Sequence, residues 1–205
     1  MLYRLFPLAP GTPRPDPFDV PRALQGQSRH DNPDHYTALY CAREAVSAVA
    51  ERIQGFRGRM LTPGMFRRPD GTVLALATLE EQLDGIVDLD DPEVLARERV
   101  RPSRVATGDR SVTRALALRF FDAGVPGISW WSTLEAAWTN VTLYDVRLPA
   151  NAVRVADVRP LDLDDELVRA AAERLGVGMP REHDGADDTP AGIVRLPVRR
   201  PRGGA

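Results

Sequence analysis

The segment ALYCAREAVSAVAE, residues 38–51, contains the end of one predicted element and most of the next. Its first residues complete the apolar run YTALYC (36–41), which is typical of a β-strand. Over residues 42–56 apolar side chains recur at helical spacing, and Gly55 or Gly58 is predicted to end the helix. The segment therefore predicts a strand followed directly by a helix.

The rest of the chain contains strands and helices that do not alternate regularly. Apolar runs predict further strands over residues 2–8, 72–79, 84–89, 125–131, 140–148 and 153–158. Helical spacing and capping signals predict further helices over residues 93–99, 111–123 and 164–175. A doubly wound α/β sheet would require regular alternation, so the sequence predicts the α+β class, with mixed or antiparallel sheets and flanking helices.

The chain is long enough to bury a sizeable core and is most simply one domain. Residues 9–24 contain five prolines and predict a long, extended loop. After Met179 the sequence becomes polar and rich in proline, arginine and glycine. We therefore expect a compact domain over residues 1–178 and a flexible tail over residues 179–205.

All 27 basic side chains of the 205 residues are arginines, and 29 acidic residues bring the formal charge to −2. A near-neutral chain lacks the positive excess of a general nucleic-acid-binding protein, so we expect no direct nucleic-acid partner. Arginine, alanine, proline and glycine together are typical of a G+C-rich genome. Any single arginine is therefore weak evidence for function, and position and spacing have to identify a site.

Several classes of protein are excluded by what the sequence lacks. No apolar run approaches the length of a membrane helix, and no apolar signal-peptide run is present, so we expect a cytoplasmic protein without membrane contact. A single cysteine, Cys41, excludes an internal disulfide and a cysteine-based zinc site. The motifs GxGxxG after a strand, GxxxxGK[ST], HExxH and GxSxG are absent.

Two histidines and two aspartates lie within six residues, at His30, Asp31, Asp34 and His35. Imidazole and carboxylate groups so close in sequence could ligate a metal. Alternatively they form a polar turn around Pro33, in which the side chains bond the local backbone. Because Pro33 prevents a helix that would align the two imidazoles, the turn is favoured and no metal is expected.

A wider set of polar side chains has regular spacing. Arg29 precedes the strand over 36–41, Tyr40 lies near its end, and Glu51 lies on the helix that follows; the spacing is 11 positions from Arg29 to Tyr40 and again from Tyr40 to Glu51. Far downstream, Ser132 ends a predicted strand and Asn140 follows eight residues later. Taken singly, each has an ordinary interpretation: a solvated loop charge, a half-buried aromatic, an exposed helix acid, a cap of the following turn.

Together these residues resemble the RES-domain family, which is named for an arginine, a glutamate and a serine. The matching parts are Arg29, ALYCAREAVSAVAE (38–51), GISWWS (127–132) and Asn140, preceded by the first strand LYRL (2–5). The resemblance extends over about residues 2–160. Where the family usually has Gly-Gly-Arg-Trp-Asn, this chain has Gln-Ser-Arg-His at 27–30, with Asn32 close by.

The resemblance implies a fold similar to that of ADP-ribosyltransferases and an activity that consumes NAD as substrate. Characterised members are toxins of bacterial toxin–antitoxin pairs, and they cleave the nicotinamide–ribose bond by hydrolysis or phosphorolysis. The resemblance makes Arg29, Tyr40, Glu51 and Ser132 the catalytic residues. Glu51 would stabilise the positive charge that develops on the ribose or bind the ribose hydroxyl groups, and no metal or redox cofactor is required.

The same resemblance implies an NAD-binding set of Arg4, Arg29, Tyr40, Ser132 and Asn140. The arginines would hold the pyrophosphate through paired, charge-assisted bonds, and Tyr40 would stack on the nicotinamide or adenine ring. Ser132 and Asn140 would position the amide or a phosphate by hydrogen bonds.

Two other functions stay open: transfer of ADP-ribose to a protein, and a relative that binds NAD or a partner without catalysis, for which the altered Arg29 loop is the argument. The toxin interpretation implies a small antitoxin of the helix-turn-helix type that blocks the site, in a complex that could contain a homo-oligomer of the toxin. Trp130, Trp131 and Trp138 are candidates for its docking surface, although core packing is the favoured role for most of them.

Overall fold

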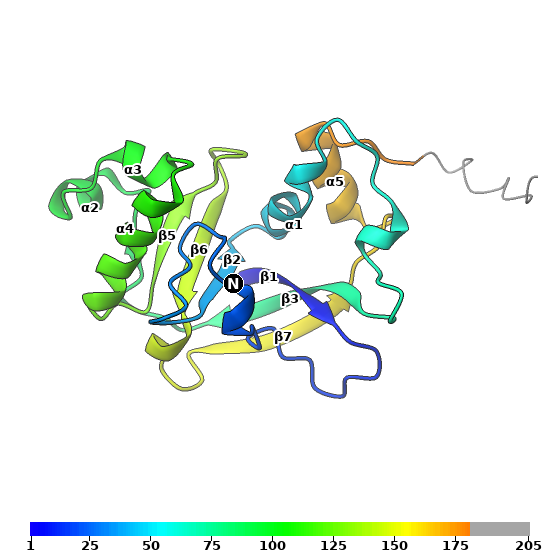
Figure 1. The fold of residues 1–205 in the computed structure, drawn as a ribbon, viewed down its shortest axis with the longest axis horizontal. Helices are drawn as coiled ribbons and strands as arrows, with labels where there is room; N and C mark the ends of the chain where they lie inside the picture. Colours follow the sequence, from blue (N-terminus) through cyan, green and yellow to red (C-terminus); the bar gives the residue numbers. More distant parts are fainter. Residues whose placement is uncertain (181–205) are drawn as a thin grey trace, which may run out of the picture.

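The computed structural model describes residues 1–180, so all but the first two residues of the predicted tail, 179–205, lie outside the described residues. Seven strands form one sheet in the order β4-β5-β6-β2-β1-β3-β7 (Figure 1). Their bounds are β1 Leu2–Leu8, β2 Ala38–Ala42, β3 Val73–Glu81, β4 Val87–Asp88, β5 Gly127–Trp131, β6 Thr139–Tyr144 and β7 Val153–Pro160. Only β4 and β5 pair in parallel among these strands, so the sheet is mixed and the predicted α+β class is confirmed.

The sheet is nearly divided between β2 and β1. These two strands pair at a single position, Tyr3 with Ala42, whereas β1 pairs with β3 along its whole length, from Leu2 to Leu8. One half of the sheet is therefore β4-β5-β6-β2 and the other is β1-β3-β7. Because β2 and β1 pair only at Ala42, the last residue of β2, the β2 backbone groups before it that face β1 are left for other partners.

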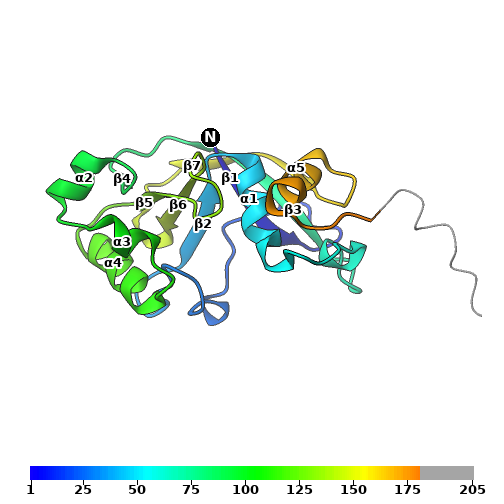
Figure 2. The same ribbon diagram turned by 90° about the horizontal axis from the view of Figure 1, so that it is seen from above.

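Two helices cover the half that contains β1 and β3. They are α1 (Ala45–Ile53) and α5 (Glu166–Leu175), which lie together in Figure 2. Val49 and Ile53 of α1 pack with Val168 and Leu175 of α5 in one buried cluster, which is the apolar stripe expected of each helix. The predicted end of α5 is confirmed, since Gly176 adopts the left-handed conformation of a helix C-cap, with φ of 65°.

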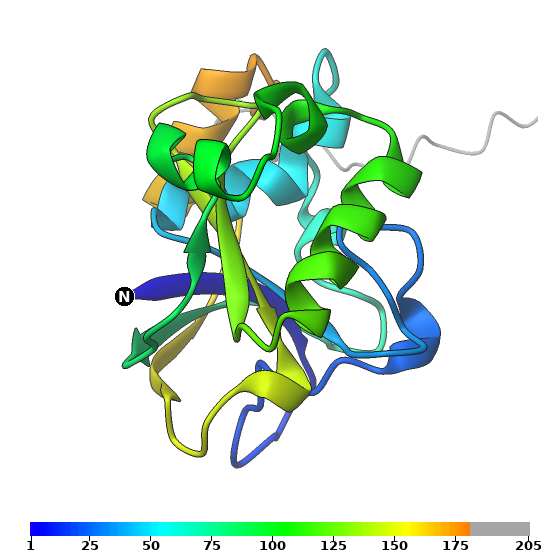
Figure 3. The same cartoon turned by 90° about the vertical axis from the view of Figure 1, so that its left-hand side faces the viewer.

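Three helices cover the other half. They are α2 (Pro92–Arg97), α3 (Pro102–Ala106) and α4 (Arg110–Asp122), and Figure 3 shows α4, in green, standing beside the strands. Phe120 of α4 packs with Ile128 and Tyr144 of the sheet in a second buried cluster. The helix α3 was not predicted, because five residues are too few to show helical spacing. No helix within residues 1–180 is long and apolar enough to cross a membrane.

Several predicted boundaries were wrong in detail. The strand over 84–89 shrinks to β4, because Gly85 has a φ of 82° that a strand does not accommodate. The strand over 140–148 ends at Tyr144, and a 3₁₀ turn follows in which the Asp145 side chain accepts from the Val146 amide. The helix over 42–56 begins only at Ala45, because Ala42 still pairs in the sheet.

The three tryptophans belong mainly to the packed interior. Trp130 and Trp138 are 6% and 5% exposed, so core packing is their main role, as expected. Trp131 at the end of β5 is half-buried against the cluster beneath α4.

Candidate functional site

A cavity of about 390 Å³ opens where the two halves of the sheet separate. It brings together residues from seven separate segments of the chain, and five of the six predicted site residues line it. These five are Arg4, Arg29, Tyr40, Glu51 and Asn140. The sixth, Ser132, is buried behind the wall and reaches the site through Glu51.

The Glu51 carboxylate is held by donors from the residue after β5, from β6 and from the turn after α1. Its Oε1 accepts from the Ser132 hydroxyl at 3.0 Å and from Asn140 Nδ2 at 2.8 Å, and Gln54 Nε2 donates to Oε2 at 2.7 Å. Glu51 is therefore not a freely exposed helix acid. The contacts leave it fixed in position at the cavity wall, which suits electrostatic stabilisation of a positive charge.

Ser132 has a positioning role in this arrangement. Its one hydroxyl proton is donated to Glu51, and its oxygen accepts from the Leu134 amide at 3.1 Å. The predicted cap of the following turn is thus present, together with the contact to Glu51. Both contacts orient the hydroxyl toward the carboxylate.

Arg29 is tied to the neighbouring helices, and is not a solvated loop charge. Its Nη1 donates to the Val105 carbonyl at 2.6 Å, and its Cζ lies 4.8 Å from the centre of the Trp130 ring. Burial lowers the pKa of the guanidinium, and the positive charge of Arg110 lowers it further. Nε and Nη2 of Arg29 have no hydrogen-bond partner among the described residues, so they remain available to a ligand.

Arg4 supports the opening in the sheet. Its Nη1 donates to the Tyr40 carbonyl at 2.8 Å, and its Nε donates to the Pro17 carbonyl at 2.7 Å. The guanidinium thereby satisfies a β2 carbonyl where β1 has moved away, and burial lowers its pKa. Only Nη2 is left without a partner within residues 1–180, which limits what Arg4 can give a ligand.

Asp31 organises the loop that carries Arg29, and its role was not predicted individually. Its Oδ2 accepts from three successive backbone amides, those of residues 26, 27 and 28, at 2.7–3.0 Å. Its Oδ1 accepts from the Tyr40 hydroxyl at 2.8 Å. The polar-turn interpretation had indicated a side chain bonded to local backbone, and Asp31 makes that contact.

Tyr40 and His30 fix the same loop from inside. The Tyr40 hydroxyl accepts from the His30 amide at 2.8 Å, and burial, with the nearby Asp31 charge, raises the Tyr40 pKa. The His30 ring is buried, with Nδ1 2.8 Å from Thr142 Oγ1 and its ring edge-on to Trp130. Burial and the charges of Arg29 and Arg110 hold the His30 pKa well below its usual range, so the ring is neutral.

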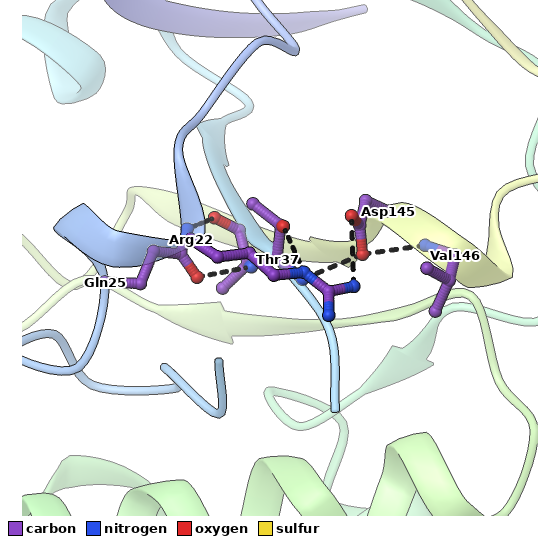
Figure 4. A network of polar contacts seen from close by, with 6 residues as sticks. Arg22, Gln25, Thr37, Asp145 and Val146 are labelled. Carbon is purple, nitrogen blue, oxygen red and sulfur yellow. Dashed lines mark hydrogen bonds and ion pairs between the residues drawn. The ribbon is translucent and has the colours of Figure 1, made fainter. Parts of the chain in front are cut away.

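The beginning of this loop is fastened to the start of β2, as Figure 4 shows. The Gln25 side chain makes two 2.9 Å hydrogen bonds to the backbone of Ala38, one as donor and one as acceptor. Arg22 Nε donates to Thr37 Oγ1 at 3.4 Å and its guanidinium lies 3.9 Å from the Asp145 carboxylate. Attachments at both ends hold the loop over β2 although it contains no long helix or strand.

Asp31→Ala is expected to loosen the loop. Three amides and one hydroxyl lose an acceptor, and we expect a loss of about 2 kcal/mol in the free energy of unfolding, measured in urea. Hydrogen exchange at the amides of 26–28 should accelerate at the same time. The exposed Asp34, three residues further along the same turn, makes Asp34→Ala the matched control. Equal exchange rates in the two variants would contradict this role for Asp31.

Charge in the cavity is strongly positive. Of the described residues that line it, four are arginines (Arg4, Arg29, Arg52 and Arg110), and Glu51 is the one acid. Within residues 1–180, no three histidine, cysteine, aspartate or glutamate side chains converge as a potential metal site. The arrangement suits a ligand that carries negative charge at one end and develops positive charge near Glu51.

Comparison with known proteins places these observations in a family. The family model described as RES domain matches residues 1–166. The chain is similar in structure to a chain of the M. tuberculosis MbcT–MbcA toxin–antitoxin complex, with a TM-score of 0.60 and 15% sequence identity over 86% of this chain and 87% of that one. No curated protein matches in sequence. At this identity the structural likeness concerns the fold.

Proposed function

Because the chain belongs to the RES-domain family, we propose that it is a toxin of a bacterial toxin–antitoxin module that breaks the nicotinamide–ribose bond of NAD in the cytoplasm. The observation that carries the proposal is the Glu51 carboxylate, held by Ser132 and Asn140 in a cavity whose other charged lining residues are arginines. A substrate with an anionic diphosphate and a ribose that becomes cationic matches both features.

The chemistry requires one carboxylate beside the ribose. When the bond from ribose C1′ to the nicotinamide nitrogen breaks, its electron pair leaves with nicotinamide, which becomes neutral. The ribose becomes oxocarbenium-like, and the Glu51 carboxylate stabilises that positive charge. Ser132 and Asn140 donate to the same oxygen of Glu51 and so prevent the carboxylate from turning away.

The reaction is completed by an acceptor that adds to C1′. Water gives ADP-ribose and a proton, inorganic phosphate gives the phosphorylated product, and a protein side chain gives an ADP-ribosylated protein. All three outcomes share the first step and the same use of Glu51. Hydrolysis and phosphorolysis are the outcomes that we propose first.

Arg29 contributes the main diphosphate contact in this proposal. Val105 and the Trp130 ring fix its guanidinium, and its remaining donors are available for paired bonds to phosphate oxygens. Arg4 adds at most one amino group, because its other donors are bonded to backbone. The Tyr40 ring, and not its engaged hydroxyl, is the part that can stack on a base.

The proposal includes a partner. The similar solved structure is that of a toxin–antitoxin complex, and we propose that a small helix-turn-helix antitoxin covers the cavity of this chain. Co-expression with the product of an adjacent reading frame should give a stable complex in which NAD turnover is suppressed.

The direct test is nicotinamide release from NAD by the purified full chain, with and without inorganic phosphate. Release in both conditions is expected for hydrolysis, and release that depends on phosphate is expected for phosphorolysis. With NAD labelled in the adenosine part, protein-bound label would identify ADP-ribosyl transfer instead. Tight NAD binding without any release would contradict the enzymatic proposal and leave a binding function.

A further inference from the structure

Arg110 is a second arginine of the cavity that the proposed function leaves without a role. It is the first residue of α4 and lines the cavity together with Arg29. Many arginines of this chain pair with an acid, as Arg119 does with Glu98 at 2.8 Å. The Arg110 guanidinium, by contrast, has no hydrogen bond or ion pair with any residue in the described part of the chain.

Hydrogen bonds of the surrounding loop hold Arg29 near Arg110, although the two positive charges repel each other. The Thr113 hydroxyl donates to the Arg29 carbonyl at 2.5 Å, and Arg29 itself donates to the Val105 carbonyl. Arg114 donates to the Ser28 carbonyl at 3.2 Å. These contacts dock the loop along α4, which is visible in Figure 3 as the blue segment beside the long green helix.

The charge of Arg110 acts on its neighbours in the free protein. It lowers the pKa of Arg29 and of the buried His30, in both cases in addition to the effect of burial. Both arginines line one cavity whose described wall contains a single acid, and that acid is already bonded to Ser132 and Asn140. An anion placed between the two guanidinium groups would remove their repulsion.

We propose that Arg110 and Arg29 together bind the diphosphate of the substrate, one phosphate group facing each guanidinium, and that Arg110 is a positioning and affinity residue without a part in breaking the bond. This proposal rests on the proposed function for the identity of the substrate. The N-terminal end of the thirteen-residue α4 adds a favourable dipole at the same place. Glu51 then faces the ribose.

The experiment measures binding and turnover separately in the full chain. Arg110→Gln should weaken binding of ADP about ten- to hundredfold in calorimetry and raise KM for NAD by a similar factor, with kcat within about twofold. Arg110→Lys should recover part of the ADP affinity, because the charge returns without the planar fork. Adenosine, which lacks the diphosphate, should bind equally to all these proteins.

A matched control is Arg104→Gln. Arg104 is exposed on the neighbouring α3 and lies outside the cavity lining. Its substitution removes the same charge as Arg110→Gln, but at a distance from the cavity, so ADP affinity should stay within about twofold. An Arg110→Gln protein with wild-type ADP affinity, or with lowered kcat at unchanged KM, would overturn the proposal.

The outcomes also separate this inference from the proposed function. If the wild-type chain binds ADP without turning over NAD, and Arg110→Gln loses that binding, the diphosphate site stands and the enzymatic proposal fails. If the wild-type chain consumes NAD but Arg110→Gln leaves the ADP affinity unchanged, only the proposed role of Arg110 fails. A chain that neither binds ADP nor consumes NAD overturns both.

Discussion

Glu51→Gln is expected to reduce nicotinamide release from NAD by about a thousandfold or more, measured as kcat in a steady-state assay. Glutamine has nearly the same shape as glutamate, and its Oε1 can still accept from Ser132 and Asn140. The substitution therefore removes the negative charge while it preserves the contacts that hold α1 against β5 and β6. Loss of nicotinamide release in a normally folded variant would show that the reaction requires the negative charge of Glu51.

The matched control for this variant is Glu173→Gln. Glu173 lies on the outer face of α5, is exposed and makes no side-chain hydrogen bond with the described residues, so activity and stability should stay at wild-type values. A Glu51→Gln enzyme that retains a tenth or more of wild-type kcat would remove Glu51 from the proposed chemistry. In that case the carboxylate would be a link between α1 and the sheet.

The part of the site that sequence could predict is the part encoded locally or in recurring motifs. Tyr40 and Glu51 belong to one strand–helix unit, so their relative positions follow from the segment 38–51. Ser132 directly follows β5 and Asn140 is the second residue of β6, and because these strands are antiparallel neighbours, the sequence spacing places the two residues close together. Arg29 belonged to the same spacing pattern, and it lines the cavity with Tyr40, Glu51 and Asn140.

The remaining features depend on contacts between distant segments. Arg4 was predicted to bind the pyrophosphate, yet two of its nitrogens donate to backbone carbonyls, Tyr40 in β2 and Pro17 in the loop after β1. No local sequence pattern reveals these contacts. Arg110 enters the cavity only because the loop around Arg29 packs on α4. In a chain with 27 arginines and no lysine, residue type gave no reason to choose Arg110.

The departure from the family loop also has a physical explanation. The chain lacks the two glycines and the tryptophan of the usual motif, and has Gln27, Ser28 and His30 in their places. Asp31 binds the backbone amides on one side of Arg29, and the buried His30 ring contacts Thr142 on the other. Arg29 therefore lies in the cavity wall without those residues.

Gly127→Ala is expected to disturb the pairing of β5 with β6, the strands next to Glu51. Gly127 begins β5, and a Cβ atom there would lie 2.5 Å from the Thr142 carbonyl oxygen and 3.0 Å from Leu143 Cδ2. The Thr142 carbonyl belongs to the backbone of β6 and cannot rotate away as a flexible side chain can, so β5 and β6 would have to move apart. We expect the free energy of unfolding to fall by about 3 kcal/mol, measured by urea unfolding followed through tryptophan fluorescence.

The same movement should impair the site. Ser132 continues from β5 and Asn140 belongs to β6, and both donate to one oxygen of Glu51, so separating these strands lengthens at least one of the two bonds. Nicotinamide release should therefore fall in the fraction of Gly127→Ala protein that remains folded. Gly64→Ala is the control, since a Cβ at Gly64 meets no atom within 4 Å and its φ needs no glycine. If the urea midpoint of Gly127→Ala equals that of the wild type and the variant keeps full activity, then the spacing of β5 and β6 does not position Glu51.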